Sequence, residues 1–191
     1  MSVGCIIHGG SKSSSIGDRT YYNWRGQMLW QHAYNTAREI TNEIVVVGVD
    51  IEIERTRQKT INKALQMIKS NRVIIFDLST PLVTGKHLKA LENTEAKSAT
   101  FALPVNTGVY NSDSKMHCDS AHLFLVQGPQ IFDTNLLKDA YKKTSLVHTQ
   151  EDTCIIKEVH GIEPLILPGN SDFLFEFQSQ RDMKVIDALA I

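Results

Sequence analysis

Asp77 ends the apolar run Val73–Phe76, and Pro81 follows shortly after it. Because proline has no backbone N–H to donate, it stops a strand. The pattern therefore predicts a carboxylate at the carboxyl end of a buried strand, which is the edge of an open α/β sheet where ligands bind. Asp77 is a candidate ligand contact. The alternative interpretation is a solvated strand-end carboxylate or a helix cap.

The loop His8–Gly17 directly follows a first apolar segment, Val3–Ile7. Its glycines, Gly9 and Gly10, allow the backbone to approach a ligand, and successive N–H groups can form an anion-binding nest. Lys12 adds a charge suited to phosphate, although an exposed loop lysine is the alternative. The loop matches neither common phosphate-loop signature, so a plain flexible connector stays open.

Three cysteines, Cys5, Cys118 and Cys154, are widely spaced and odd in number. This favours reduced thiols and a cytoplasmic protein over a disulfide framework. His117 and His122 lie close to Cys118, but their spacing does not match a structural zinc site.

The order of the elements predicts an α/β fold. Buried strands are expected at Val3–Ile7, Glu43–Gly48, Val73–Phe76 and Ala99–Val105. Helices with apolar residues at helical spacing are expected at Gly26–Ile40, Arg57–Lys69 and from a Thr84 cap through Leu91. Such alternation indicates a mostly parallel sheet with helices on both faces, a three-layer Rossmann-like architecture.

The second half of the chain interrupts this alternation. Residues 106–121 are polar and rich in turn residues, which predicts a projecting β-arm. The remaining expectations are a strand at Leu123–Val126, a sharp loop at Gln127–Gln130, a helix at Phe132–Tyr141, strands at Pro164–Leu167 and Phe173–Phe177, and a closing helix at Arg181–Ala190.

Length and composition set outer limits on the function. The 191 residues fit one domain spanning 1–191. The net charge is −1 and no Lys/Arg-rich block occurs, so a nucleic-acid surface is not expected. No apolar run approaches the roughly 20 residues that a membrane helix needs, so no membrane association is expected.

Several short motifs, taken in order, resemble the cytidylyltransferases that make CDP-alcohols from 2-C-methyl-D-erythritol 4-phosphate or ribitol 5-phosphate. They are similar to the family's Ala-Ala-Gly loop, its "GkplleH" helix start, "RQxSV", "HDAARPLVT", "ALPV" and "QTPQxF", and stand here as Ile7–Gly10, Asn23–His32, Arg57–Ile61, Phe76–Thr84, Ala102–Val105 and Gln127–Phe132. The resemblance implies the nucleotide-diphospho-sugar transferase fold.

The resemblance also implies a reaction and its site residues. CMP would be transferred from CTP to a sugar-alcohol phosphate with release of pyrophosphate, assisted by Mg²⁺ and cationic side chains. Nucleotide contacts would come from the loop residues His8, Gly9, Gly10, Ser11 and Lys12, and from Thr60 and Asp77. Asp77 would hold Mg²⁺. Arg19 and Lys12 would be the catalytic cations, although Arg19 could equally be a surface residue. The arm would form a homodimer.

Several positions depart from the family pattern. At several positions where the family carries arginine or lysine, this chain has an uncharged or acidic residue: Ser13 or Ser14, Thr80, Ser120 and Glu176. Arg55 stands where the family has an acidic residue. Because each electrostatic contact to a transition state is worth several kcal/mol, this loss motivates a second hypothesis. In it, the chain is a catalytically inactive pseudoenzyme that acts as a binding or assembly module.

Overall fold

The fold is described from a computed structural model that covers residues 2–9, 12–13, 17–146, 151–171 and 175–190. Its centre is a six-stranded sheet in the order β12-β8-β11-β7-β1-β6. These strands span Val3–His8 (β1), Ile44–Val46 (β6), Arg72–Asp77 (β7), Ser98–Pro104 (β8), Phe124–Asp133 (β11) and Leu165–Pro168 (β12).

The sheet is mixed rather than wholly parallel. β1 pairs in parallel with β6 and β7, and β12 pairs in parallel with β8. β11 runs antiparallel between β7 and β8. Parallel pairing of β1 and β7 places His8 directly opposite Asp77, so both side chains lie at the same carboxyl edge of the sheet.

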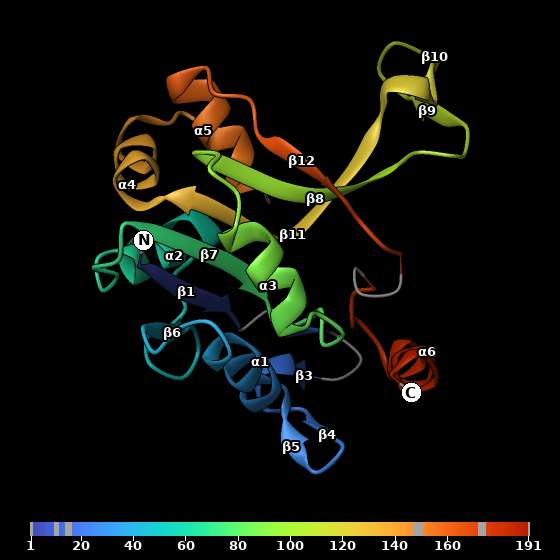
Figure 1. The fold of residues 1–191 in the computed structure, drawn as a ribbon. Helices are drawn as coiled ribbons and strands as arrows, with labels where there is room; N and C mark the ends of the chain where they lie inside the picture. The colour runs from blue at the N-terminus through green and yellow to red at the C-terminus, as the bar shows by residue number, and fades with distance from the viewer. Residues whose placement is uncertain (1, 10–11, 14–16, 147–150, 172–174, 191) are drawn as a thin grey trace.

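Helices cover both faces of the sheet, as the alternating pattern predicted (Figure 1). On one face lie α1 (Leu29–Arg38), α3 (Gly85–Glu92) and α6 (Gln180–Leu189), which share one apolar core with the sheet. On the other face lie α2 (Arg57–Leu65), α4 (Thr134–Lys143) and α5 (Asp152–His160), which share a second core. The predicted three-layer α/β architecture is confirmed.

Two apolar faces on each central strand explain this arrangement. In β7, Ile74 and Phe76 belong to one core, whereas Val73 and Ile75 belong to the other. All four side chains are at most 2% exposed. A strand that is apolar on both sides must be covered on both sides, which is why the run Val73–Phe76 forms the middle of the sheet.

Several predicted boundaries were wrong. The expected short strand, sharp loop and helix start between residues 123 and 133 are one long strand, β11, whose register shifts between Gln127 and Gln130. Residues 175–177 are not a strand, and 173–174 lie outside the described residues. α2 ends at Leu65, and Gln27–Met28 forms β5 of a small hairpin with β4 (Asn23–Trp24) before α1 begins.

Residues 106–121 contain the predicted arm. β9 (Val109–Asn111) and β10 (Met116–Cys118) form an antiparallel pair that stands away from the central sheet (Figure 1). Two of its large apolar side chains are exposed, Tyr110 at 56% and Met116 at 65%. Among the described residues, no helix has the length and apolar character needed to cross a membrane.

Candidate active site

A cleft of about 390 Å³ opens at the carboxyl edge of β1 and β7. Its walls come from β1, β7, β11, the start of α2, the residue before α5 and the segment before α6. The lining side chains are mostly polar or charged: His8, Arg19, Arg57, Asp77, Ser79, Gln127, Gln130, Glu151, Glu176 and Gln178, with Ile75, Val126 and Gly128. This is the sheet edge at which the sequence predicted a ligand site.

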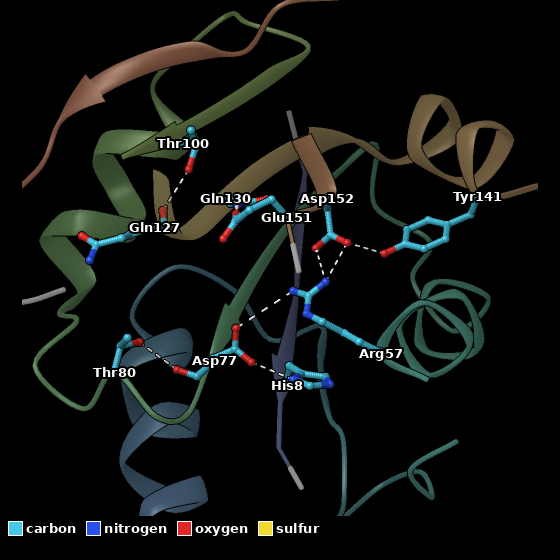
Figure 2. Close-up of polar contacts among 10 residues, drawn as sticks. All are labelled: His8, Arg57, Asp77, Thr80, Thr100, Gln127, Gln130, Tyr141, Glu151 and Asp152. Carbon is cyan, nitrogen blue, oxygen red and sulfur yellow. Dashed lines mark hydrogen bonds and ion pairs between the residues drawn. The ribbon is translucent and has the colours of Figure 1, made fainter. Parts of the chain in front are cut away.

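Asp77 lies at the centre of a hydrogen-bonded and ionic group in this cleft (Figure 2). The Nδ1–H of His8 donates to its Oδ1 at 2.6 Å, and Nη2 of Arg57 lies 4.0 Å from its Oδ2. Burial alone would raise the pKa of Asp77, but the hydrogen bond and charge of His8, and the charges of Arg57 and Arg19, outweigh burial and lower that pKa. The Asp77 side chain is therefore ionised, and 39% of its surface remains exposed.

Arg57 lines the cleft and forms an ion pair with the buried Asp152. Its Nη1 donates to both carboxylate oxygens of Asp152, at 2.7 and 2.8 Å, and the Tyr141 hydroxyl donates to the same carboxylate. Burial opposes the charge of Arg57, but Asp152 and Asp77 raise its pKa above the ordinary value. Because Asp152 is 1% exposed, this contact fixes the guanidinium at the floor of the cleft.

The segment that precedes α6 forms another wall of the cleft. Nη1 of Arg19 donates to the carbonyl oxygen of Phe177 at 2.7 Å. The backbone N–H of Phe177 in turn donates to the carbonyl of Ser79, two residues after β7 ends. These contacts place Glu176 and Gln178, on either side of buried Phe177, at the cleft.

Gln130 and Glu151 form the wall above Asp77 in Figure 2. Nε2 of Gln130 donates to the carboxyl group of Glu151. Burial, followed by the nearby negative charge of Asp152, raises the pKa of Glu151 to about 7. A carboxyl group with such a pKa changes its protonation state near neutrality, which makes it a candidate functional group.

The structure brings together three of the predicted site residues, His8, Arg19 and Asp77, in one cleft. Gly10 and Ser11 lie outside the described residues. Lys12 belongs to the two-residue strand β2 (Lys12–Ser13), and its side chain is likewise outside what is described. The nucleotide contacts assigned to these loop residues remain predictions.

Gly9 has a packing role at the end of β1. A Cβ atom on Gly9 would lie 2.3 Å from the carbonyl oxygen of Val47 and 2.9 Å from Cδ2 of Leu78. Close packing between the end of β1 and its neighbours therefore requires glycine at this position. The predicted contact of Gly9 with a nucleotide stays a prediction.

Thr60 is the predicted contact that the structure does not bring to the cleft. Its side chain is 0% exposed, and its hydroxyl accepts from the N–H of Glu54 and donates to the carbonyl of Thr56. The hydroxyl thus both donates and accepts a hydrogen bond within the protein. The residue stabilises the first turn of α2 and the segment before it, and its contact with a nucleotide stays a prediction.

The residue types and spacing did not predict a site role for Arg57 or Gln130. Arg57 was placed only at the start of a helix, since its partner Asp152 is 95 residues away in sequence. Gln130 was assigned to a loop because glycine and proline precede it. Both residues belong to motifs that carry the family resemblance, next to predicted site elements. That position was the signal that could have identified them as site residues.

Asp77 is suited to hold a divalent cation only together with other ligands. Among the described residues, no cluster of three or more His, Cys, Asp or Glu side chains could form a complete metal site. Mg²⁺ commonly takes one or two carboxylates and completes its shell with water and substrate phosphates. One ionised, partly exposed carboxylate in a cleft fits that mode, so Asp77 could hold an ion that arrives with a triphosphate.

Comparison with known proteins places this architecture. A model of the 2-C-methyl-D-erythritol 4-phosphate cytidylyltransferase family matches residues 28–189. The cytidylyltransferase of that name from Halalkalibacterium halodurans is 28% identical over 71% of this chain and 62% of its own length. A bifunctional IspD/IspF enzyme from Nitratiruptor is 24% identical over 80% of this chain but 38% of its own length. The chain thus spans less than two thirds of these relatives.

Solved structures agree on the fold. The 2-C-methyl-D-erythritol 4-phosphate cytidylyltransferase from Thermus thermophilus superimposes with a TM-score of 0.81 at 20% identity, covering 100% of this chain and 99% of that one. The bifunctional IspDF from Campylobacter jejuni gives a TM-score of 0.84 at 22% identity, over 96% of this chain and 54% of that one. With the family model matching most of the sequence, this chain belongs to the 2-C-methyl-D-erythritol 4-phosphate cytidylyltransferase family.

Proposed function

We propose that this chain transfers CMP from CTP to a sugar-alcohol phosphate in the cleft at Asp77. An oxygen of the acceptor phosphate forms a bond to the α-phosphorus of CTP, and the bond from that phosphorus to the bridging oxygen breaks. The electron pair leaves with pyrophosphate. The observation that carries the proposal is the ionised Asp77 at the carboxyl edge of β1 and β7 in a member of this family.

The residues of the cleft would have different roles in this reaction. Asp77 would hold Mg²⁺, which supplies charge neutralisation on the triphosphate when bound. Arg19 and Arg57 are the arginines of the described lining, and hydrogen bonds to Phe177 and to Asp152, respectively, hold them in place. Because catalysis of phosphoryl transfer rests mainly on positioning and electrostatics, fixed guanidinium groups are suited to it.

Pyrophosphate release from CTP and Mg²⁺ in the presence of sugar-alcohol phosphates tests the proposal. We expect release with the intact protein and a loss of about 100-fold or more in Asp77→Asn, the effect of removing one electrostatic contact to a transition state. Asp139→Asn is the matched control, because this carboxylate lies on the exposed side of α4 in a surface pair with Lys143. Equal release by both variants would refute the role of Asp77.

A second candidate function is a binding module without transfer. It is favoured by one observation: Glu176, a carboxylate, lines the cleft where the family resemblance predicts a lysine. In that case CTP would bind with Mg²⁺ but no pyrophosphate would be released with any acceptor. The same assay, combined with a CTP binding measurement, separates the two functions.

A further inference from the structure

Two glutamine side chains on one wall of the cleft present carbonyl oxygens that lack a hydrogen-bond donor. Gln127 and Gln130 both line the cleft, and Gln130 is 3% exposed. The Oε1 atom of each is buried and has no hydrogen-bond partner within the part of the chain that the structure describes. Because buried carbonyl groups in folded proteins are nearly always paired, two unpaired ones on the same wall indicate that a ligand supplies the donors.

The backbone of β11 fixes the places of the two glutamines. They flank the register shift against β8, and the Thr100 hydroxyl donates to the backbone carbonyl of Gln127 at 2.9 Å. Figure 2 shows the two side-chain amides apart from each other, with that of Gln130 beside Glu151. The amides are therefore separate acceptors along the wall, suited to a ligand with more than one donor.

The Gln130 amide has a defined orientation. Its Nε2 donates to the carboxyl group of Glu151, whose pKa is about 7. Above that pH the carboxylate can only accept hydrogen bonds, so the donor end of the amide must face it. The Oε1 atom of Gln130 then needs a donor from elsewhere.

The carboxylates beside these amides already have cationic partners within the protein. Asp77 pairs with His8 and lies 4.0 Å from Arg57, whose charge also acts on Glu151. The missing donors can therefore be neutral, as hydroxyl groups are. An ionised phosphate offers oxygen acceptors, so it cannot pair with either glutamine carbonyl.

The order of the strands places the acceptor of the reaction on this wall. β7, which ends in Asp77, lies between β1 and β11. The loop after β1 is predicted to contact the nucleotide, so a nucleotide there leaves the β11 side of Asp77 to the acceptor. The chain of a sugar-alcohol phosphate carries several neutral hydroxyl donors, which is what the two glutamine carbonyls require.

We propose that Gln127 and Gln130 determine acceptor specificity, with Oε1 of each accepting a hydrogen bond from a hydroxyl group of the sugar-alcohol chain. The assignment rests on the proposed function for the presence of an acceptor phosphate near Asp77. It adds that the protein selects the hydroxyl groups of the acceptor as well as its phosphate.

Isothermal titration calorimetry at pH 8 tests the assignment, because Glu151 is mostly ionised at that pH. The protein with Mg²⁺ and α,β-methylene-CTP is titrated with ribitol 5-phosphate and with pentyl phosphate, which has the same carbon chain without hydroxyl groups. We expect ribitol 5-phosphate to bind at least about tenfold more tightly, the effect of two hydrogen bonds. Equal affinity, a preference for pentyl phosphate, or no binding of either probe would overturn the assignment.

Gln127→Met and Gln130→Met each remove one carbonyl and keep an unbranched side chain of similar length. We expect each variant to weaken ribitol 5-phosphate binding about fivefold to tenfold, and pentyl phosphate binding not at all. Gln66→Met, at the exposed end of α2, is the control. Thermal unfolding checks that each variant is folded, and Gln127 is only half-buried, so its variant serves if Gln130→Met unfolds. Equal weakening of both probes, or of neither, would contradict the proposal.

The ribose hydroxyls of CTP are the other source of neutral donors in this reaction. CTP, 2′-deoxy-CTP and 3′-deoxy-CTP are therefore titrated with Mg²⁺ into the native protein and both glutamine variants. We expect the variants to bind all three nucleotides as the native protein does. A loss of CTP affinity in a variant that is absent with either deoxynucleotide would assign the glutamine to the ribose and overturn the proposal.

The outcomes separate this inference from the proposed function. If ribitol 5-phosphate binds selectively through the glutamines but CTP never releases pyrophosphate, transfer is wrong and the specificity stands. If pyrophosphate is released equally well with ribitol 5-phosphate and pentyl phosphate, transfer stands and the role of the glutamines is wrong.

Discussion

The protonation state of one residue, Glu151, makes the stability of the folded protein depend on pH. Its pKa is raised from 4.5 to about 7 in the folded protein, chiefly by burial. Between those values the folded chain holds the proton more tightly than the unfolded chain does. The free energy of unfolding therefore falls as pH rises from about 4.5 to about 7, by up to about 3 kcal/mol for a shift of this size.

Glu151→Gln removes this ionisation while keeping a neutral group of similar shape next to Gln130. We expect the difference in unfolding free energy between variant and native protein to move in favour of the variant by about 2 kcal/mol between pH 4.5 and pH 8. Urea denaturation at the two pH values measures it. A difference that stays constant with pH would show that Glu151 titrates normally.

Residue types and spacing predicted some of the site and not the rest. Asp77 was predicted because a strand end can be read from the apolar run and the proline that follows, and His8 because it begins the glycine loop after the first apolar segment. Arg57 could not be assigned, since its function depends on Asp152 far along the chain. The hydrogen bonds of the Thr60 hydroxyl to the surrounding backbone could not be predicted either, because a short motif does not reveal such partners.

Helices α2, α4 and α5 are tied together by one buried ionic contact. Asp152 at the start of α5 accepts from Arg57 on α2 and from Tyr141 on α4. Asp152→Asn would leave the mostly buried Arg57 without its nearest counter-charge. We expect a loss of about 3–5 kcal/mol in unfolding free energy, measured by chemical denaturation.

Asp139→Asn is the control for that experiment, since it breaks an exposed pair on α4 and should cost less than about 1 kcal/mol. Similar losses in the two variants would contradict a special role for the buried contact.

The end of β1 is packed too closely against its neighbours to accept a side chain. A Cβ on Gly9 would clash with the Val47 carbonyl, which is backbone and cannot rotate away. We expect Gly9→Ala to destabilise the protein by about 1–3 kcal/mol, the usual cost of overpacking. Gly108→Ala in the arm segment, where an added Cβ meets nothing within 4 Å, should be close to neutral. Thermal unfolding of both variants tests the contrast.

Elements were predicted well where periodicity alone decides them. The β-α alternation from β1 to β8 follows from apolar runs and helical spacing, and the structure has it. The second half of β11 was missed because Gly128 and Pro129 indicate a loop in sequence, whereas its first half overlaps the strand predicted at Leu123–Val126. Proline is tolerated where a strand bulges, and the register shift between Gln127 and Gln130 is such a place.

At the scale of the whole molecule, the arm predicts self-association. Tyr110 and Met116 expose apolar surface on a hairpin that stands away from the rest of the chain (Figure 1). We expect a homodimer at micromolar concentration by light scattering, and dissociation in Met116→Asp, because a charge opposes burial of that surface. Lys115→Asp alters the charge of the same hairpin beside this apolar surface, and is the control. A monomeric native protein would contradict the prediction.

We expect Asp77 to make this cleft a binding site for CTP with a divalent cation. Calorimetric titration of CTP with Mg²⁺ into the native protein, Asp77→Asn and the Asp139→Asn control tests it most directly. We expect binding to the native protein and the control, and a loss of at least about tenfold in affinity in Asp77→Asn. Equal CTP affinity in all three proteins, or no binding to the native protein, would contradict it.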